Sequence, residues 1–213
     1  MRKGTTNNYF DWSTKCGGVR KCYEGKPTVA VGGFKVDIDL LPLNAAVPAG
    51  TLVYADEQAR TITPIYTFKV TAVDSGAKTI TVEKFETGTL ASAGMKLIPV
   101  GADLSQASAN QATVASVDSS ADDVDVLTVD ATTGISVNDV LAVSGDDKKI
   151  IAIPNGLTYC DNVRDEKAYA MDIDYVWNCI DKPVLERRML PLTDSLKKAL
   201  RDNECYFRFS NRK

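Results

Sequence analysis

The sequence contains no histidine in its 213 residues. Histidine is the commonest general base in enzymes and the commonest protein ligand of transition metals. A glycine-rich phosphate loop and a nucleotide-binding motif are also missing from the sequence. We therefore expect a protein that is not an enzyme, has no cofactor and has no metal site.

The sequence also lacks an apolar run long enough to cross a bilayer, and its polar, aromatic N-terminus differs from a signal peptide. We therefore expect no membrane contact. Five cysteines are present, an odd number, and none of them form a Cys-x-x-Cys pair. This usage is typical of thiols in a reducing cytoplasm, with a Cys16–Cys22 disulfide as the open alternative.

Charge is distributed unevenly, although the net charge is only −3. Residues 1–26 contain six Lys or Arg against two acids, and residues 182–213 contain nine bases against four acids. Residues 102–147 contain nine Asp and no base. We expect the ends and the middle of the chain to face different surroundings. A basic segment with interspersed acids is more typical of a solvated surface or a protein interface than of a nucleic-acid site, so we predict no nucleic-acid partner.

The middle of the chain contains an internal repeat, Val70–Gly101 and Val114–Gly145, with an offset of 44 residues (114 − 70). Aligned without gaps, both copies open with Val-x-x-Val-Asp-Ser, and both have a leucine near the end, Leu97 and Leu141. A repeat of this kind defines the unit of the fold. We predict two similar β units within residues 70–145.

A turn signal recurs at the same spacing. Gly50, Gly94 and Asn138 are each 44 residues apart, and each stands shortly before an apolar strand. Gly and Asn are the residues that tolerate a left-handed backbone. We predict one recurrent turn at these positions, and hairpin turns at Asp74–Ala77 and Asp118–Asp123.

Outside the repeat, alternating apolar and polar residues predict further strands. They are Thr28–Val31, Phe34–Leu40, Thr61–Val73, Ile150–Ile153, Gly156–Tyr159, Ala168–Ile180 and Cys205–Phe209. The clearest helix follows the N-cap Thr193, with an apolar stripe of Leu192, Leu196, Ala199 and Leu200.

These elements predict a mainly β protein. Residues 27–69 and 146–213 are expected to form a small β-sandwich or barrel-like domain with one short C-terminal helix, residues 193–203. Residues 70–145 are expected to be an inserted tandem β repeat, with copies at 70–101 and 114–145. Residues 1–26 are expected to form an extended arm.

Two sets of carboxylates suggest chemistry. The first set could offer oxygen ligands to calcium, but its spacing differs from an EF-hand and a solvated hairpin turn is more common. It consists of Asp118, Asp122, Asp123 and Asp125. The second set could supply a glycosidase pair, but acids on a strand usually face solvent. It consists of Asp161, Asp165, Glu166, Asp172 and Asp174. We predict neither activity.

The expected arm carries three clustered aromatic residues and two adjacent bases. They are Tyr9, Phe10, Trp12, Arg20 and Lys21. One interpretation is a frayed terminus, which is the usual structure of such a segment. The other is an arm whose rings dock on a partner, since aromatic and Arg residues are enriched at interface cores.

Two stretches carry a family resemblance: VPAGTLVYADE at residues 47–57, and the block IPNGLTYCDNV…MDIDYVWNCIDKPVLERRMLPLTDSLKKAL at residues 153–200. Together they resemble the head-fibre and head-decoration (capsid auxiliary) proteins of tailed bacteriophages, especially those of Bacteroides-type hosts. In those proteins a Pro-Ala-Gly-Thr corner opens a small β domain, and a Gly-Leu-Thr-Tyr strand and an Asp-x-Val-Trp type strand lead to a short helix.

The resemblance implies a structural virion protein on the outer surface of the capsid, assembled in the cytoplasm of the bacterial host. Its expected partner is the major capsid protein, and a homotrimer is the favoured oligomer. The expected capsid contacts are Tyr9, Phe10, Trp12, Arg20 and Lys21. Two alternatives stay open: a tail, baseplate or adhesin module that binds host glycan, and a minor capsid or head–neck protein.

Overall fold

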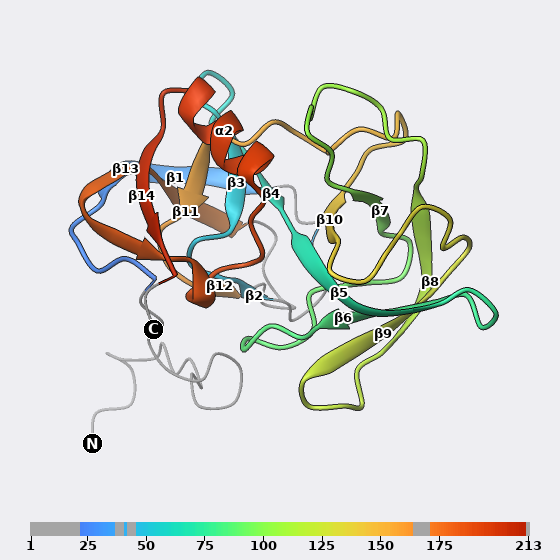
Figure 1. Cartoon of the computed structure of the whole chain (residues 1–213). Coiled ribbons are helices and arrows are strands. Elements are labelled where there is room, and N and C mark those ends of the chain that lie inside the picture. The colour runs from blue at the N-terminus through green and yellow to red at the C-terminus, as the bar shows by residue number, and fades with distance from the viewer. Residues whose placement is uncertain (1–21, 37–40, 42–45, 164–170, 212–213) are drawn as a thin grey trace.

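The structure, a computed structural model, describes residues 22–36, 41, 46–163 and 171–211. Within these residues the protein is mainly β with a single α-helix, as the sequence predicted. The strands form two units that lie side by side (Figure 1). We call the unit that contains both ends of the described chain the first lobe, and the unit formed by β5–β10 the barrel.

The first lobe is built around a ring of five strands. Because β1 pairs with both β4 and β13, the order β1–β4–β3–β11–β13 closes on itself, and β14 continues the sheet beyond β13. The strands are β1 (Thr28–Val36), β3 (Leu52–Asp56), β4 (Thr61–Ile65), β11 (Gly156–Thr158), β13 (Met171–Leu185) and β14 (Tyr206–Ser210). A small separate sheet pairs β2 (Ala46–Val47) with β12 (Asn162–Val163).

The helix α2 (Asp194–Asp202) packs against this lobe after the short 3₁₀ helix η2 (Glu186–Arg188). The Thr193 hydroxyl accepts a hydrogen bond from the backbone N–H of Leu196 at 3.4 Å. Leu196, Ala199 and Leu200 are buried. The predicted cap and the predicted apolar stripe are thus confirmed.

The barrel is closed and antiparallel, with the order β10-β5-β6-β9-β8-β7. Its strands are β5 (Thr67–Asp74), β6 (Thr79–Glu83), β7 (Lys96–Pro99), β8 (Ala112–Asp118), β9 (Val124–Val129) and β10 (Val140–Val143). Each copy of the repeat supplies three strands. The third strand of each copy pairs with the first strand of the other, β10 with β5 and β7 with β8. The two copies therefore share one barrel, because this exchange leaves neither copy with an open edge.

The register shows that the two copies are related by a local twofold axis. The axis passes between Ile80 and Leu127, which pair across β6 and β9, and between Ile98 and Ala142, which pair across β7 and β10. The register shifts just after Val70 in β5 and just after Val114 in β8, which are equivalent positions. The bulge in the sheet is therefore repeated along with the sequence.

The recurrent turn is also confirmed. Gly50, Gly94 and Asn138 have φ angles of 80°, 87° and 73°. In each case the backbone N–H of the next residue donates to the carbonyl of the residue three positions before it. The three distances are 3.1, 3.2 and 3.1 Å. This is the geometry of a turn whose third residue needs a positive φ, which explains the choice of Gly and Asn.

The gapless alignment of the copies is wrong over their second strands. Asp74 pairs with Thr79, but Asp118 pairs with Val126, so the turns contain four residues (75–78) and seven residues (119–125). The counterpart of Ile80 is therefore Leu127. The path from Leu127 to Val140 is three residues shorter than that from Ile80 to Lys96 (140 − 127 = 13 against 96 − 80 = 16). The third strands therefore match again at an offset of 44, Lys96–Pro99 with Val140–Val143.

Three predicted strands differ from the structure. The predicted strand Thr61–Val73 breaks at Tyr66, where the chain leaves the first lobe and enters the barrel. Residues 28–36 form one strand with a register shift between Ala30 and Phe34, while residues 37–40 lie outside the described part. Residues 150–153 contribute only a bridge between Ile150 and Ser144.

The alternation along β13 also changes partway. The alternation in Ala168–Ile180 predicts that Ile173, Tyr175 and Trp177 share the core side. Ile173 and Tyr175 are buried, but so is Val176, and Trp177 is 40% exposed. Val176 pairs with Val29 and Asn178 pairs with Thr28, so Trp177 is an extra residue in the ladder. This bulge turns the tryptophan out of the predicted core.

Candidate functional site

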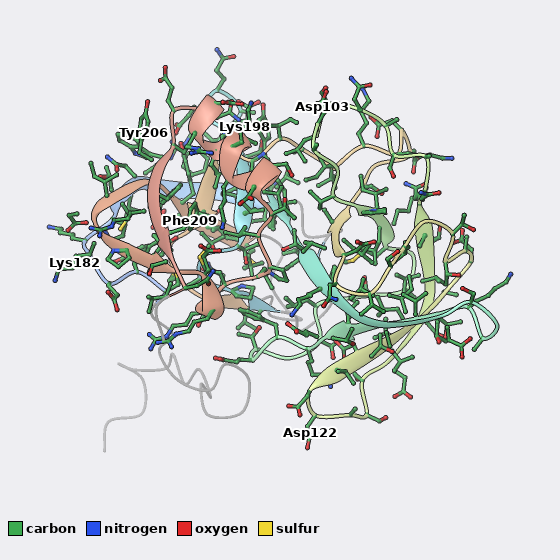
Figure 2. All side chains as sticks on the ribbon, in the orientation of Figure 1. Asp103, Asp122, Lys182, Lys198, Tyr206 and Phe209 are labelled. Atoms are coloured by element: carbon green, nitrogen blue, oxygen red, sulfur yellow. The ribbon has the colours of Figure 1, made fainter. Side chains whose placement is uncertain are left out.

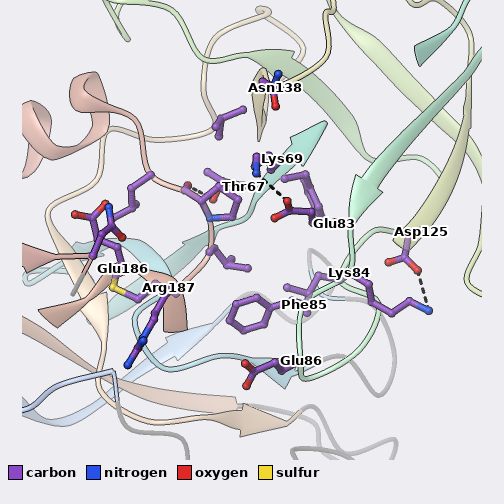
Figure 3. Close-up of a pocket in the computed structure, with 18 residues that line it drawn as sticks. Thr67, Lys69, Glu83, Lys84, Phe85, Glu86, Asp125, Asn138, Glu186 and Arg187 are labelled. Atoms are coloured by element: carbon purple, nitrogen blue, oxygen red, sulfur yellow. Dashed lines mark hydrogen bonds and ion pairs between the residues drawn. The ribbon is translucent and has the colours of Figure 1, made fainter. Parts of the chain in front are cut away.

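A cleft of about 550 Å³ lies between the two lobes (Figure 3). It is lined by β5, by the end of β6 and the residues after it, and by the segment from η2 to the start of α2. The Thr67 hydroxyl joins the two sides, since it donates to the Pro191 carbonyl at 2.7 Å. On the barrel side the Lys69 ammonium lies 2.8 Å from a Glu83 carboxylate oxygen.

Lys84 and Asp125 form the most buried ion pair of this cleft. The Lys84 Nζ is 3.3 Å from Asp125 Oδ1, and Asp125 is only 2% exposed. Asp125 also accepts a hydrogen bond from the Thr89 hydroxyl at 3.0 Å. Lys84 further donates to the carbonyls of Ser119, at 2.7 Å, and Ala121. One ammonium thus holds the longer hairpin turn against β6.

This arrangement corrects the expectation that Asp125 belongs to a solvated acidic turn. Asp118, Asp122 and Asp123 are exposed, whereas Asp125 is a structural ion-pair partner. In the described part of the chain, no group of three or more His, Cys, Asp or Glu residues could hold a metal ion.

The second carboxylate set is spread over separate structural roles. Asp161 accepts from the backbone N–H of Ala49 at 2.6 Å, and Asp174 accepts from that of Gly33 at 3.1 Å. Asp172 is exposed on β13. Asp165 and Glu166 lie outside the described residues. Asp161 and Asp174 therefore cap backbone groups at two different places in the first lobe.

The predicted capsid contacts Tyr9, Phe10, Trp12, Arg20 and Lys21 all lie outside the described residues. The structure does show where the chain that follows them is anchored. Cys22 is fully buried, and its carbonyl accepts from the Leu185 N–H at 2.8 Å. The Tyr23 hydroxyl donates to the Thr158 carbonyl at 2.6 Å, and burial raises the pKa of this tyrosine. Residues 22 and 23, which we expected in the arm, are therefore part of the first lobe.

The strands β13 and β14 of this lobe also carry exposed residues. They are Trp177, Ile180, Tyr206 and Arg208. Ile180 is 60% exposed and Tyr206 is 52% exposed. Tyr206 pairs with Asn178 at the start of the parallel β13–β14 ladder. Sequence reasoning predicted both strands, but it could not show which of their aromatic residues face outward.

The two lobes differ in what they expose. All four exposed large aromatic residues of the described chain lie in the first lobe: Tyr54, Tyr159, Trp177 and Tyr206. The barrel exposes aspartates instead. Figure 2 shows this separation, with Tyr206 and Lys182 on the first lobe and Asp103 and Asp122 on opposite sides of the barrel.

The fold and these surfaces define a mainly β protein with two closed units, one of which carries the exposed aromatic side chains of the described residues. Comparison of the chain with protein-family models, curated proteins and solved structures finds no match. Within the described residues, no helix has the length and apolar character needed to cross a membrane.

Proposed function

We propose that the protein is a structural virion protein, a head-fibre or decoration protein bound to the outer surface of a tailed-phage capsid. Its partner in this proposal is the major capsid protein, and it has no catalytic step. The first lobe and the arm contact the shell, and the barrel projects into solvent.

The observation that carries the proposal is the difference between the two lobes. Aromatic rings are enriched in interface cores, while exposed carboxylates are depleted there. The exposed rings all lie in the first lobe. The arm leaves this lobe at Cys22, whose carbonyl is bonded to the end of β13 next to β14. The arm of this proposal joins the lobe that carries the exposed rings, which supports the assignment of both to the capsid contact.

The experiment is to strip the protein from particles of the phage that encodes it and to add back purified variants. The wild-type chain should rebind to a fixed number of sites on each particle. A variant that lacks residues 1–21 should lose occupancy and stay folded. The deletion ends at residue 21 because Cys22 and Tyr23 are part of the lobe.

A matched control replaces Asp122 and Asp123, at the exposed tip of the barrel, with Asn. This variant should bind particles like the wild type. If the wild-type protein is absent from purified particles and does not bind stripped ones, the proposal is wrong.

The alternative of a glycan-binding adhesin gains one observation from the structure. Glycan sites commonly use exposed rings, and Tyr159 and Trp177 provide them in the first lobe, whereas Phe85 in the barrel is only half-exposed. Binding of the purified protein to glycans of the host surface, without binding to capsids, would favour the adhesin.

A further inference from the structure

The strand β14 has the one open edge among the longer strands of the described fold. The barrel is closed, and the five-strand ring of the first lobe is closed by the pairing of β1 with β13. Only β14 and the two-residue strands β2 and β12 have a single neighbour. No described residue hydrogen-bonds to the outer edge of Tyr206–Phe209. An open edge is a template for another strand. Residues Tyr206–Phe209 contain no Pro, and the irregularity of the β13–β14 ladder lies in β13, between Cys179 and Val184.

The strand is held firmly from one side. Phe207 and Phe209 pack toward the buried cluster under α2, with their ring centroids 5.7 Å apart. The Lys197 ammonium lies 5.6 Å from the centroid of the Phe209 ring. The other side carries Tyr206 and Arg208, whose exposed side chains make no hydrogen bond or ion pair with any described residue. The strand therefore offers its edge in a fixed position.

We propose that two copies of the chain join along this edge, with the two β14 strands antiparallel and centred on Phe207. Tyr206 and Arg208 are two residues apart, so their side chains lie on the same face of the strand. Antiparallel pairing centred on Phe207 places Tyr206 opposite Arg208 of the partner subunit. By symmetry, Arg208 lies opposite Tyr206 of the partner subunit. Each guanidinium then meets a tyrosine ring, a favourable cation–π pair. A twofold contact repeats this pair and extends the sheet of one first lobe into the other.

Centring on Tyr206 would set Arg208 opposite Glu204, but Glu204 lies before the strand with a φ of 59°, so the ladder does not reach that pair. Centring on Arg208 would place two guanidinium groups directly opposite each other, and like charges in that position destabilise a sheet. Centring on Phe209 would pair Arg208 with Ser210 and would leave Tyr206 near the end of the ladder. The sequence of β14 thus favours a second copy of itself in one register.

This inference does not depend on the proposed function, because it concerns the assembly of the purified chain alone. It also differs from the homotrimer that the resemblance implies. The mass in solution separates the two possibilities, whether or not the protein binds a capsid.

The first test is light scattering combined with size-exclusion chromatography over a range of concentrations. The wild type should have the mass of a dimer at high concentration. Arg208→Glu should weaken the dimer by roughly tenfold, because a carboxylate replaces the cation over the ring. Lys149→Glu is the matched control, with the same charge change at an exposed position in the turn after β10 of the barrel, and it should leave the dimer unchanged.

The second test fixes the register by crosslinking. Directly opposed residues of an antiparallel pair have Cα atoms about 4.5–5.5 Å apart, within the range of a disulfide. In a background with Cys160→Ser, the double variant Tyr206→Cys/Arg208→Cys should form a disulfide-linked dimer on mild oxidation. Either single variant should stay monomeric on a denaturing gel, because neither position faces itself. A monomer at all concentrations, a trimer, or equal crosslinking in the single variants would overturn the proposal.

Discussion

At the scale of single residues, the strongest interactions join segments that are distant in the sequence. Lys84, at the end of β6, holds the turn that leads into β9 through Asp125 and two carbonyls. Asn155 bonds to both the N–H and the carbonyl of Ala55, at 2.7 and 2.8 Å, as a neighbouring strand would. Side chains of this kind replace backbone pairing where the ladder ends.

Replacing Lys84 with Met should lower the free energy of unfolding by about 3–5 kcal/mol, because it leaves the Asp125 carboxylate buried without its cation. Lys69→Met is the matched control. The Lys69–Glu83 pair is exposed, with 41% and 50% of the two side chains accessible, and its loss should cost at most about 1 kcal/mol. Urea unfolding of both variants measures the difference. Equal losses would show that Lys84 and Asp125 are not a buried pair.

Cys205 predicts a dependence of stability on pH. Its thiol is buried and donates to the Asn155 carbonyl at 2.8 Å, and burial raises its pKa from 9.0 to about 11. Between these two values the folded protein holds a proton that the unfolded chain releases. The free energy of unfolding therefore falls as the pH rises through this window and is unaffected below it.

Thermal melting between about pH 8 and about pH 11 tests this dependence. The melting temperature of the wild type should fall across the range, and Cys205→Ala should show a smaller fall. Cys160→Ala is the comparison at an exposed cysteine, whose pKa burial raises less, so it should reduce the fall less than Cys205→Ala does. A melting temperature that falls equally in the wild type and in Cys205→Ala would rule out the thiol as a cause.

At the scale of elements, the same turn is used three times in different surroundings. Gly50 is enclosed, because a Cβ atom there would lie 2.8 Å from Met189 Cγ and 3.1 Å from Cys22 Sγ. Gly94 has the same backbone conformation but nothing within 4 Å of that position. Substitution of Gly94 therefore measures the free-energy cost of a left-handed backbone alone. Substitution of Gly50 adds the cost of steric overlap with Met189 and Cys22.

Gly94→Ala should cost about 1–2 kcal/mol, the penalty of a left-handed conformation for a residue with a Cβ. Gly50→Ala should cost about 1–3 kcal/mol more, because it also overpacks the core under Met189. Asn138→Gly should change stability by less than about 1 kcal/mol, since Gly is favoured there. Denaturant midpoints measure the three variants. A larger loss for Gly94→Ala than for Gly50→Ala would contradict this account of the turn.

The sequence predicted the strands, the turn and the helix because local patterns determine them. Alternation shows which residues of a strand share a face, but not which strand is the neighbour. It therefore could not show that β7 pairs with β8 and β10 with β5. The turn between Asp118 and Val126 has three more residues than its counterpart, and β13 has a bulge at Trp177. A gapless alignment cannot represent the first shift, and a strict alternation cannot represent the second. Alternation also could not show that Tyr206 is exposed. The aromatic residues Tyr206 and Phe207 are adjacent and lie on opposite faces of β14, so the pattern does not indicate which face is buried.

At the scale of the whole molecule, the exchange of third strands makes the two copies of the repeat depend on each other. The side chains of Val70, Leu97, Val114 and Leu141, two from each copy, are buried in one cluster. A single copy would leave this apolar face and two strand edges in water. Domains of about 40 residues or fewer rarely fold without such a partner.

A fragment of residues 66–145 should therefore give the circular dichroism of a β protein and a cooperative unfolding transition. Fragments 66–104 and 105–145, each with one copy, should be unfolded when separate, because β7 and β10 then lack the strands with which they pair. Mixing them should restore the β spectrum with a one-to-one mass, since each supplies the first strand that the other needs. Val114→Asp in the second fragment is the control, because a buried charge at this position should prevent recovery. Cooperative unfolding of either half alone would show that the copies are independent units that only touch.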